Sequence, residues 1–198
     1  MTKKDKLFFA NFIIWTPLYA WPVNENTITS FVWGYEIGRG KKCGFIDLMC
    51  SRLSKKLKVK ENALGWSDLI TKHAQKNSLS WVVAFKKESI ETLASEEAGG
   101  MDKDLKKIFK RRVLYLISNI GEDANYCFNQ DWIDHWSIFC SSKNDWFKEF
   151  WTEEEYKAIK MIGRLINKAD FKNAQPLKAS SELLKQKAKF ERSSDAVK

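Results

Sequence analysis

The residues best suited to chemistry lie around one histidine in the second half of the chain. Asp131 and His135 are four residues apart, so on a helix they would share a face, where the carboxylate could hold the imidazole in one tautomer. Such a pair could serve a general base or a metal ligand. Because His135 stands among aromatic residues, a structural histidine bonded to Asp131 is the better interpretation.

Cysteine and histidine together raise the question of a metal site, but their spacing is not that of common zinc sites. Cys127, His135 and Cys140 form a C-x7-H-x4-C pattern without a C-x2-C pair. The chain also has no G-x-S-x-G and no H-E-x-x-H, and its glycine- and lysine-rich stretch 38–44 lacks the spacing of a phosphate-binding loop. We therefore expect no metal and no cofactor, and a binding protein in preference to an enzyme.

The strongest binding signal is positive charge gathered in two segments. The formal net charge is +9, from 34 Lys and Arg against 25 Asp and Glu, and such a balance favours anionic partners. The candidate contacts are Arg52, Lys55, Lys56, Lys58 and Lys60 in the first segment and Lys103, Lys106, Lys107, Lys110 and Arg111 in the second. These cations predict binding to nucleic acid or to an acidic protein surface. A solvated helix face is the competing interpretation.

The first basic segment loosely resembles the entry to a helix-turn-helix motif. In RLSKKLKVKENAL, a predicted helix is followed by a short break and then by Asn62, Ala63 and Leu64. In that motif the second helix enters the major groove while cations hold the phosphates. Here Lys58 replaces the usual glycine of the turn, and Gly65 falls early in the second helix, so the similarity assigns no family.

The composition favours a mainly helical fold. The 198 residues are 44% hydrophobic and include nine Trp, but only nine Gly and three Pro, which is few turn residues for a many-stranded sheet. We expect a compact domain of about six helices, with the clearest ones over 45–57, 67–76, 102–121 and 152–167. Two apolar runs, Thr29–Ile37 and Leu79–Phe85, stay open between helix and one short β element.

The chain begins with MTKKDK and an apolar block, Leu7–Val23, that could be a signal, a membrane anchor or a core element. Asn11 and the bulky aromatics make a poor signal sequence. The stretch before Pro17, which would break a helix, is too short to span a membrane, since spanning requires about 20 apolar residues. We therefore expect a core helix that ends near Trp15, in a cytoplasmic protein that keeps its first residues.

We predict three regions along the chain. An N-terminal helical subdomain occupies 1–98, and a C-terminal helical subdomain, 101–169, packs on it as one core. The boundary is Gly99-Gly100, because paired glycines commonly mark a connection. Residues 170–198 form a mobile basic tail, because their apolar content is low; a helix around SELLKQKAKF, residues 181–190, stays open within it.

Two functions remain open. The first is a non-enzymatic protein that associates with nucleic acid or a nucleoprotein complex, which requires the two basic segments on one surface. The second is a helical protein-interaction module, such as an inhibitor, immunity or scaffold protein, which requires exposed Trp side chains as anchors.

Overall fold

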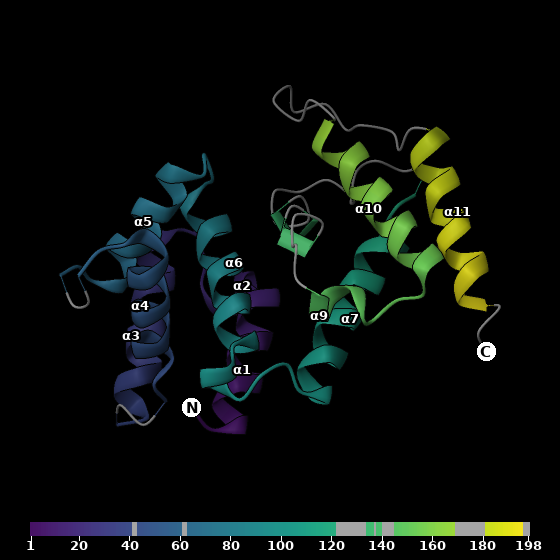
Figure 1. The fold of residues 1–198 in the computed structure, drawn as a ribbon. Coiled ribbons are helices and arrows are strands. Elements are labelled where there is room, and N and C mark those ends of the chain that lie inside the picture. The colour runs from purple at the N-terminus through teal and green to yellow at the C-terminus, as the bar shows by residue number, and fades with distance from the viewer. Residues whose placement is uncertain are drawn as a thin grey trace. The chain divides into compact units, whose positions relative to one another are not determined.

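The described part of the computed structural model is built of helices (Figure 1). The structure describes residues 1–40, 43–60, 63–121, 134–136, 138–139, 145–168 and 181–195. These residues contain no strand, so the predicted mainly helical class is confirmed. Contacts between residues divide the chain into two units, Met1–Phe109 and Lys110–Lys198.

The first unit contains six α-helices, a short 3-10 helix and the first part of a seventh α-helix. Their bounds are α1 Lys3–Ile14, α2 Thr16–Tyr19, α3 Glu25–Gly38, α4 Phe45–Leu57, α5 Trp66–Lys76, α6 Trp81–Ala94, η1 Glu96–Ala98 and α7 Lys103–Ser118. The run Thr29–Ile37 therefore lies within α3, and Leu79–Phe85 leads into α6, so neither is a strand.

The apolar block at the start of the chain forms the core of the first unit. Phe9, Phe12 and Ile13 of α1 are fully buried, and α1 packs along α6. Pro17 lies in the first turn of α2, directly after the end of α1, because proline suits the start of a helix but not its interior. The predicted N-terminal core helix is thus confirmed.

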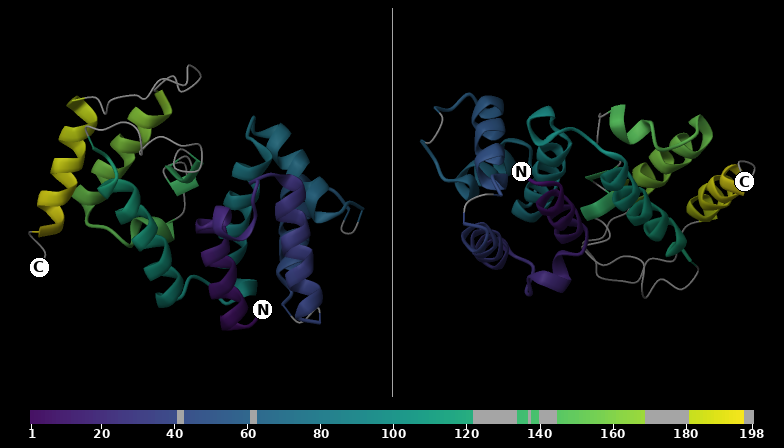
Figure 2. Two further views of the ribbon diagram at one scale, coloured as in Figure 1. Left: turned by 180° about the vertical axis from the view of Figure 1, so that it is seen from behind. Right: turned by 90° about the horizontal axis from the view of Figure 1, so that it is seen from below.

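Three helices, α4, α5 and α6, pack on one another beside α1 (Figures 1 and 2). The bounds predicted for α4 agree with the structure. The start of α5 differs from the prediction, because Gly65 is its cap residue and Ser67 lies inside the helix. The Ser67 hydroxyl instead donates a hydrogen bond to a Glu25 carboxylate oxygen of α3, at 2.6 Å.

The second unit holds the remainder of α7 together with α9 Asp145–Lys148, α10 Glu153–Lys168 and α11 Ser181–Asp195. A capping box begins α10 as the sequence predicts: the Thr152 N–H donates to Glu155 Oε2 at 2.8 Å, and the Glu155 N–H donates to Thr152 Oγ1 at 3.2 Å. Residues 134–136 and 138–139 are helical, and Trp136 and Phe139 are buried.

The second half of the predicted tail contains the helix that the sequence left open around SELLKQKAKF, but this helix is docked where the prediction was a mobile tail. Ser181–Asp195 forms α11, which packs along α10 (Figure 2). Leu183 and Phe190 are buried, and the Phe190 ring centroid lies 5.7 Å from that of Trp151. Apolar residues spaced along one face of α11 are sufficient to dock it, although its overall composition is polar. Residues 169–180 and 196–198 lie outside the described part of the chain.

The limit between the two units also lies elsewhere than the sequence suggests. Gly99 and Gly100 both have positive φ angles, of 87° and 68°, so they form a turn that glycine accommodates without strain. The contacts, however, place the limit within α7, between Phe109 and Lys110. The packing of two subdomains as one core stays a prediction.

Candidate binding surface

The first basic segment, Arg52–Lys60, lies at the carboxyl end of α4. Lys55 and Lys56 occupy its last turn, and Lys58 and Lys60 follow in the connection to α5; all four are exposed, and Arg52 is half-buried. Among the described residues, no carboxylate forms an ion pair with Lys55, Lys58 or Lys60. These three ammonium groups are therefore available to an anion.

Lys58 has a backbone conformation that lysine rarely adopts. Its φ and ψ angles are 56° and 40°, in the left-handed region, where it ends α4 while the Val59 N–H donates to the Ser54 carbonyl at 3.0 Å. Glycine is the usual residue at such a helix end. A residue with a Cβ pays about 1–2 kcal/mol for this conformation, so a cation is held here at a conformational cost.

The connection after α4 does not have the geometry of the helix-turn-helix entry that its sequence resembles. It runs from Lys58 to Gly65, whereas that motif uses a turn of about three or four residues. Asn62 lies outside the described residues. The length of this connection therefore argues against a helix-turn-helix motif.

Lys56 differs from the neighbouring lysines because it forms an ion pair with a buried carboxylate. Its Nζ lies 2.6 Å from Oε1 of Glu88, a carboxylate of α6 that is only 1% exposed, and His73 Nε2 of α5 lies 3.0 Å from the same oxygen. Burial alone would raise the pKa of Glu88, but hydrogen bonds from His73 and Lys56 lower it below its ordinary value. This cluster joins α4, α5 and α6 at the base of the basic segment.

The second basic segment, Lys103–Arg111, follows α7 across the limit between the units. Lys103, Lys107 and Arg111 are exposed, and Lys106 and Lys110 are half-buried. Lys110 is engaged within the second unit, since its Nζ donates to the Phe150 carbonyl at 2.9 Å and lies 4.9 Å from the centre of a Trp151 ring. Lys103, Lys107 and Arg111 recur every four residues, so they follow one face of α7.

The first basic segment has an acidic neighbour on η1. The pKa of Glu97 is lowered mainly by hydrogen bonds from its own backbone and from Ser95, with a contribution from the charges of Lys55 and Arg52. The common surface that the sequence analysis requires for both segments stays a prediction.

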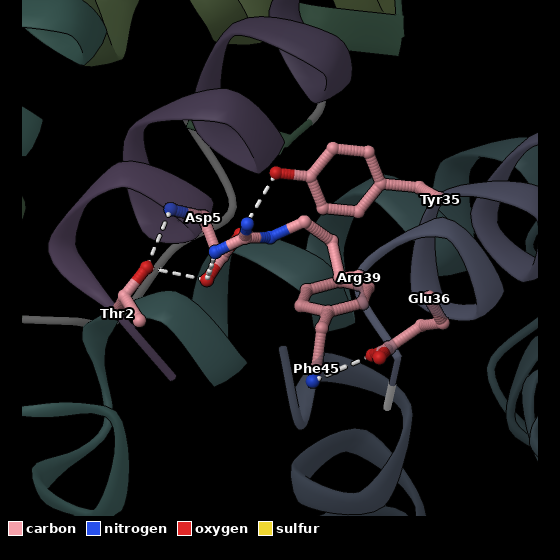
Figure 3. Close-up of polar contacts among 6 residues, drawn as sticks. All are labelled: Thr2, Asp5, Tyr35, Glu36, Arg39 and Phe45. Carbon is pink, nitrogen blue, oxygen red and sulfur yellow. Dashed lines mark hydrogen bonds and ion pairs between the residues drawn. The ribbon is translucent and has the colours of Figure 1, made fainter. Parts of the chain in front are cut away.

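A buried carboxylate connects α1 to α3 (Figure 3). Asp5 is fully buried and accepts hydrogen bonds from Arg39 Nε at 2.8 Å, from the Tyr35 hydroxyl at 2.8 Å and from the Thr2 hydroxyl. Burial by itself would raise the pKa of Asp5, but these hydrogen bonds lower it to about 2. Burial and the Asp5 carboxylate also raise the pKa of Tyr35.

Next to this cluster, Glu36 fixes the start of α4 (Figure 3). Its carboxylate oxygen accepts hydrogen bonds from the N–H groups of Phe45 and Ile46, at 2.8 and 3.0 Å. The cap residue of α4 is Gly44, which has no side chain to satisfy these donors. Glu36 therefore acts as the cap from another helix, where its negative charge also suits the positive end of the α4 dipole.

The first unit exposes a second kind of surface, made of large apolar side chains. Leu18 and Trp21 near α2 are each 79% exposed, and Trp33 and Ile37, one turn apart on α3, are 45% and 66% exposed. Trp33 borders a small depression of about 140 Å³ between α3 and α4. Exposed tryptophan is typical of protein-binding surfaces, so the requirement of the second function is met.

The residues first considered for chemistry are placed only in part. Asp131, Cys127 and Cys140 lie outside the described residues, so neither the Asp131–His135 pair nor the cysteine–histidine pattern is tested. His135 is fully buried, and its Nδ1 lies 3.3 Å from Nη2 of Arg112. Within the described residues, no group of three or more His, Cys, Asp or Glu side chains could hold a metal ion.

Two polar clusters that hold the first unit together have no obvious signal in the sequence. Asp5 lies in the charged stretch before the apolar block, where the sequence suggests a solvent-exposed residue. Glu88 lies among polar residues in FKKESIE. A weak signal existed for Glu88, because it falls on the same face as Phe85 and Thr92, at helical intervals. The partners Arg39, Lys56 and His73 come from other helices, so only the tertiary structure identifies them.

No known protein family, no curated protein and no solved structure matches this chain. Among the described helices, none is long and apolar enough to cross a membrane.

Proposed function

We propose that this chain is a non-enzymatic binding protein that attaches to nucleic acid, alone or within a nucleoprotein complex, through the basic segment Arg52–Lys60. The observation that carries this proposal is Lys58, a cation at a left-handed position where glycine would be less strained. Strain of this kind persists where the surrounding structure or a function maintains it. A cytoplasmic location belongs to the same proposal.

Lys55, Lys58 and Lys60 are the main phosphate contacts in this proposal, with Arg52 beside them. The three lysines are neighbours along the chain, and among the described residues none of them forms an ion pair with a carboxylate. Lys56 contributes less, because it already neutralises the buried Glu88. Contacts to phosphate carry no base information, so binding is expected on any sequence.

The second basic segment is the next candidate for the same ligand. Lys103, Lys107 and Arg111 offer three exposed cations along α7, while Lys106 and Lys110 are less accessible and Lys110 has a partner in its own unit. We assign these residues a supporting role, because additional contacts to phosphate increase affinity without altering specificity.

The test is a salt titration of binding to duplex and single-stranded oligonucleotides. Each phosphate contact contributes about −0.9 to the log–log slope on duplex DNA, so the triple variant Lys55→Ala, Lys58→Gly, Lys60→Ala should flatten the slope by about 3. The matched control removes three exposed lysines of the second unit, Lys148→Ala, Lys157→Ala and Lys185→Ala, and should keep the slope.

Absence of binding by the wild type at about 50 mM salt would contradict the proposal, because electrostatic contacts are strongest at low salt. If the triple variant keeps the wild-type slope, the phosphate contacts are expected at Lys103, Lys107 and Arg111 instead.

The alternative function is a protein-interaction module, and the exposure of Trp21 and Trp33 favours it. Capture of partners from a native lysate by the wild type and by a Trp21→Ala, Trp33→Ala variant distinguishes the two functions. A nuclease-resistant protein partner that is lost with the two tryptophans, but retained by the lysine triple variant, supports this alternative. Loss with the lysines and on nuclease treatment supports nucleic-acid binding.

A further inference from the structure

The second unit has an open groove along α10 and α11 that is distinct from both basic segments. Its volume is about 610 Å³, and its lining includes Glu154, Lys157, Ala158 and Met161 of α10, and Lys189 and Arg192 of α11. All the lining residues belong to these two helices, so the groove lies entirely within one unit.

The shape of the groove follows from two helices that run antiparallel. Ser194, near the end of α11, donates a hydrogen bond to Glu155, in the first turn of α10, at 2.6 Å. The lining residues of α10 recur at spacings of three and four from Glu154 to Met161. At 1.5 Å per residue this stripe is about 10 Å long. Two parallel ridges of side chains form a channel into which the ridge of a third helix packs.

The chemistry of the lining selects among possible helices. At the floor, Ala158 is small, and Met161 is an adaptable apolar side chain that is 38% exposed. Around it stand three cations, Lys157, Lys189 and Arg192, against one carboxylate, Glu154, which accepts a hydrogen bond from the Ser193 hydroxyl at 3.2 Å. Nζ of Lys157 also lies 3.4 Å from Oε1 of Glu153, but both side chains are largely exposed, so this ion pair is weak.

We propose that this groove docks an acidic amphipathic helix of a partner protein. The apolar stripe of that helix would lie on Ala158 and Met161, and carboxylates along its flanks would face Lys157, Lys189 and Arg192. Apolar anchors in a groove between helices, with charged flanks that orient the ligand, are a recurrent mode of peptide recognition. The inference does not depend on the proposed binding of nucleic acid by the first unit.

The probe is a synthetic helix of about four turns with leucines at i, i+3, i+4 and i+7 and glutamates on both flanks. We expect the full-length protein to bind it with a Kd below about 100 µM by fluorescence anisotropy. Met161 is the only methionine beyond residue 109, so in protein labelled with ¹³C-methyl methionine its signal should shift during the titration. The signal of Met49, buried in the first unit, should not.

Charge reversal tests the role of the cations. The variant Lys189→Glu, Arg192→Glu should weaken binding at least about tenfold, because like charges then face the glutamates. The matched control Arg164→Glu, Lys185→Glu makes the same change of charge at one exposed position of α10 and one of α11, both outside the groove lining. It should weaken binding less than about threefold, because exposed charges that do not line the groove remain solvated and do not face the glutamates. If the first variant lowers the melting temperature, Lys189→Ala, Arg192→Ala replaces it, with an expected loss of about three- to tenfold.

Several results would overturn the inference. These are no binding up to about 1 mM, an unshifted Met161 signal, or equal weakening by the variant and its control. Equal affinity for a peptide with glutamine in place of glutamate would remove the role of charge. Equal affinity for an acidic peptide interrupted by proline would remove the role of the helix. A Met161 signal that shifts with duplex DNA but not with the peptide would assign the groove to nucleic acid.

Discussion

Arg39 holds Asp5 with two nitrogens, Nε at 2.8 Å from Oδ1 and Nη2 at 3.3 Å from Oδ2. This bidentate contact connects the first turn of α1 to the residue after α3, segments more than 30 residues apart in the chain. Arg39 is partly exposed whereas Asp5 is fully buried, so the carboxylate end of the contact is shielded from solvent and the guanidinium end is not. Charge-assisted, two-point contacts of this kind are both stronger and more specific in geometry than single hydrogen bonds.

The pKa of Asp5 leads to a prediction about acid stability. Because the folded-state pKa is about 2, below its usual value of 3.8, the ionised form stabilises the fold at neutral pH. That contribution, about 2 kcal/mol, is complete above about pH 5 and is lost as the pH falls towards 2. Urea unfolding from pH 7 to pH 2.5 should show this loss. Asp5→Asn should lower the stability at pH 7 and weaken its dependence on pH. The control Asp47→Asn, at an exposed position, should keep the dependence of the wild type.

Substitution of Lys58 should raise stability. Lys58→Gly relieves the left-handed strain of about 1–2 kcal/mol and adds some flexibility to the unfolded chain, for a net gain of about 0.5–1 kcal/mol. Ser78→Gly should behave alike, because Ser78 also has a positive φ, of 53°. Lys60→Gly should give no gain, because φ is not positive there. Denaturant midpoints of the three variants provide the measurement, and a loss of stability in Lys58→Gly would contradict the strain argument.

The cluster around Glu88 predicts unequal effects of two substitutions. Lys56→Met leaves the Glu88 carboxylate, which is 1% exposed, without its cation and with His73 on the same oxygen, and should cost about 3–5 kcal/mol. Glu88→Gln should cost less, about 1.5–3 kcal/mol, because the half-exposed Lys56 that it leaves is solvated by water. Thermal unfolding of both variants is the comparison. A smaller loss from Lys56→Met than from Glu88→Gln would show that His73, and not Lys56, sustains the buried carboxylate.

Phe190 should be essential for the docking of α11. Phe190→Ala removes a buried ring in contact with Trp151 and should cost about 3–5 kcal/mol. The neighbouring Lys189→Ala, at an exposed position, should remain within about 0.5 kcal/mol of the wild type. Equal melting temperatures of the wild type and Phe190→Ala would restore the sequence-based expectation that this end of the chain does not contribute to the fold.

Local sequence patterns correctly predict several helices, and the elements that the sequence leaves undecided or misplaces lack such a pattern. Apolar residues at helical intervals predicted α4, and Thr152 with Glu155 predicted the start of α10. Thr29–Ile37 and Leu79–Phe85 were undecided because a short apolar run has no periodicity that separates strand from helix. α11 is mostly polar, so the sequence does not identify Leu183 and Phe190 as core residues. They are buried because α11 packs along α10.

The candidate site was predictable in composition but not in geometry. The cations at 52–60 are evident from the sequence alone, and their exposure follows from their position at the end of an amphipathic helix. The left-handed backbone of Lys58 and the attachment of Lys56 to Glu88 depend on packing between helices. The sequence therefore treats five cations as equivalent, whereas the structure distinguishes them.

The cap that Glu36 provides has a consequence for the order in which the first unit opens. The amide hydrogens of Phe45 and Ile46 are bonded to a side chain of α3, so they can exchange with solvent only when α3 separates from α4 or Glu36 releases them. Hydrogen exchange at these two amides should therefore follow the opening of α3 and slow together with it. An isolated peptide of α4 has no such cap, so the helix that presents the basic segment should open cooperatively with α3.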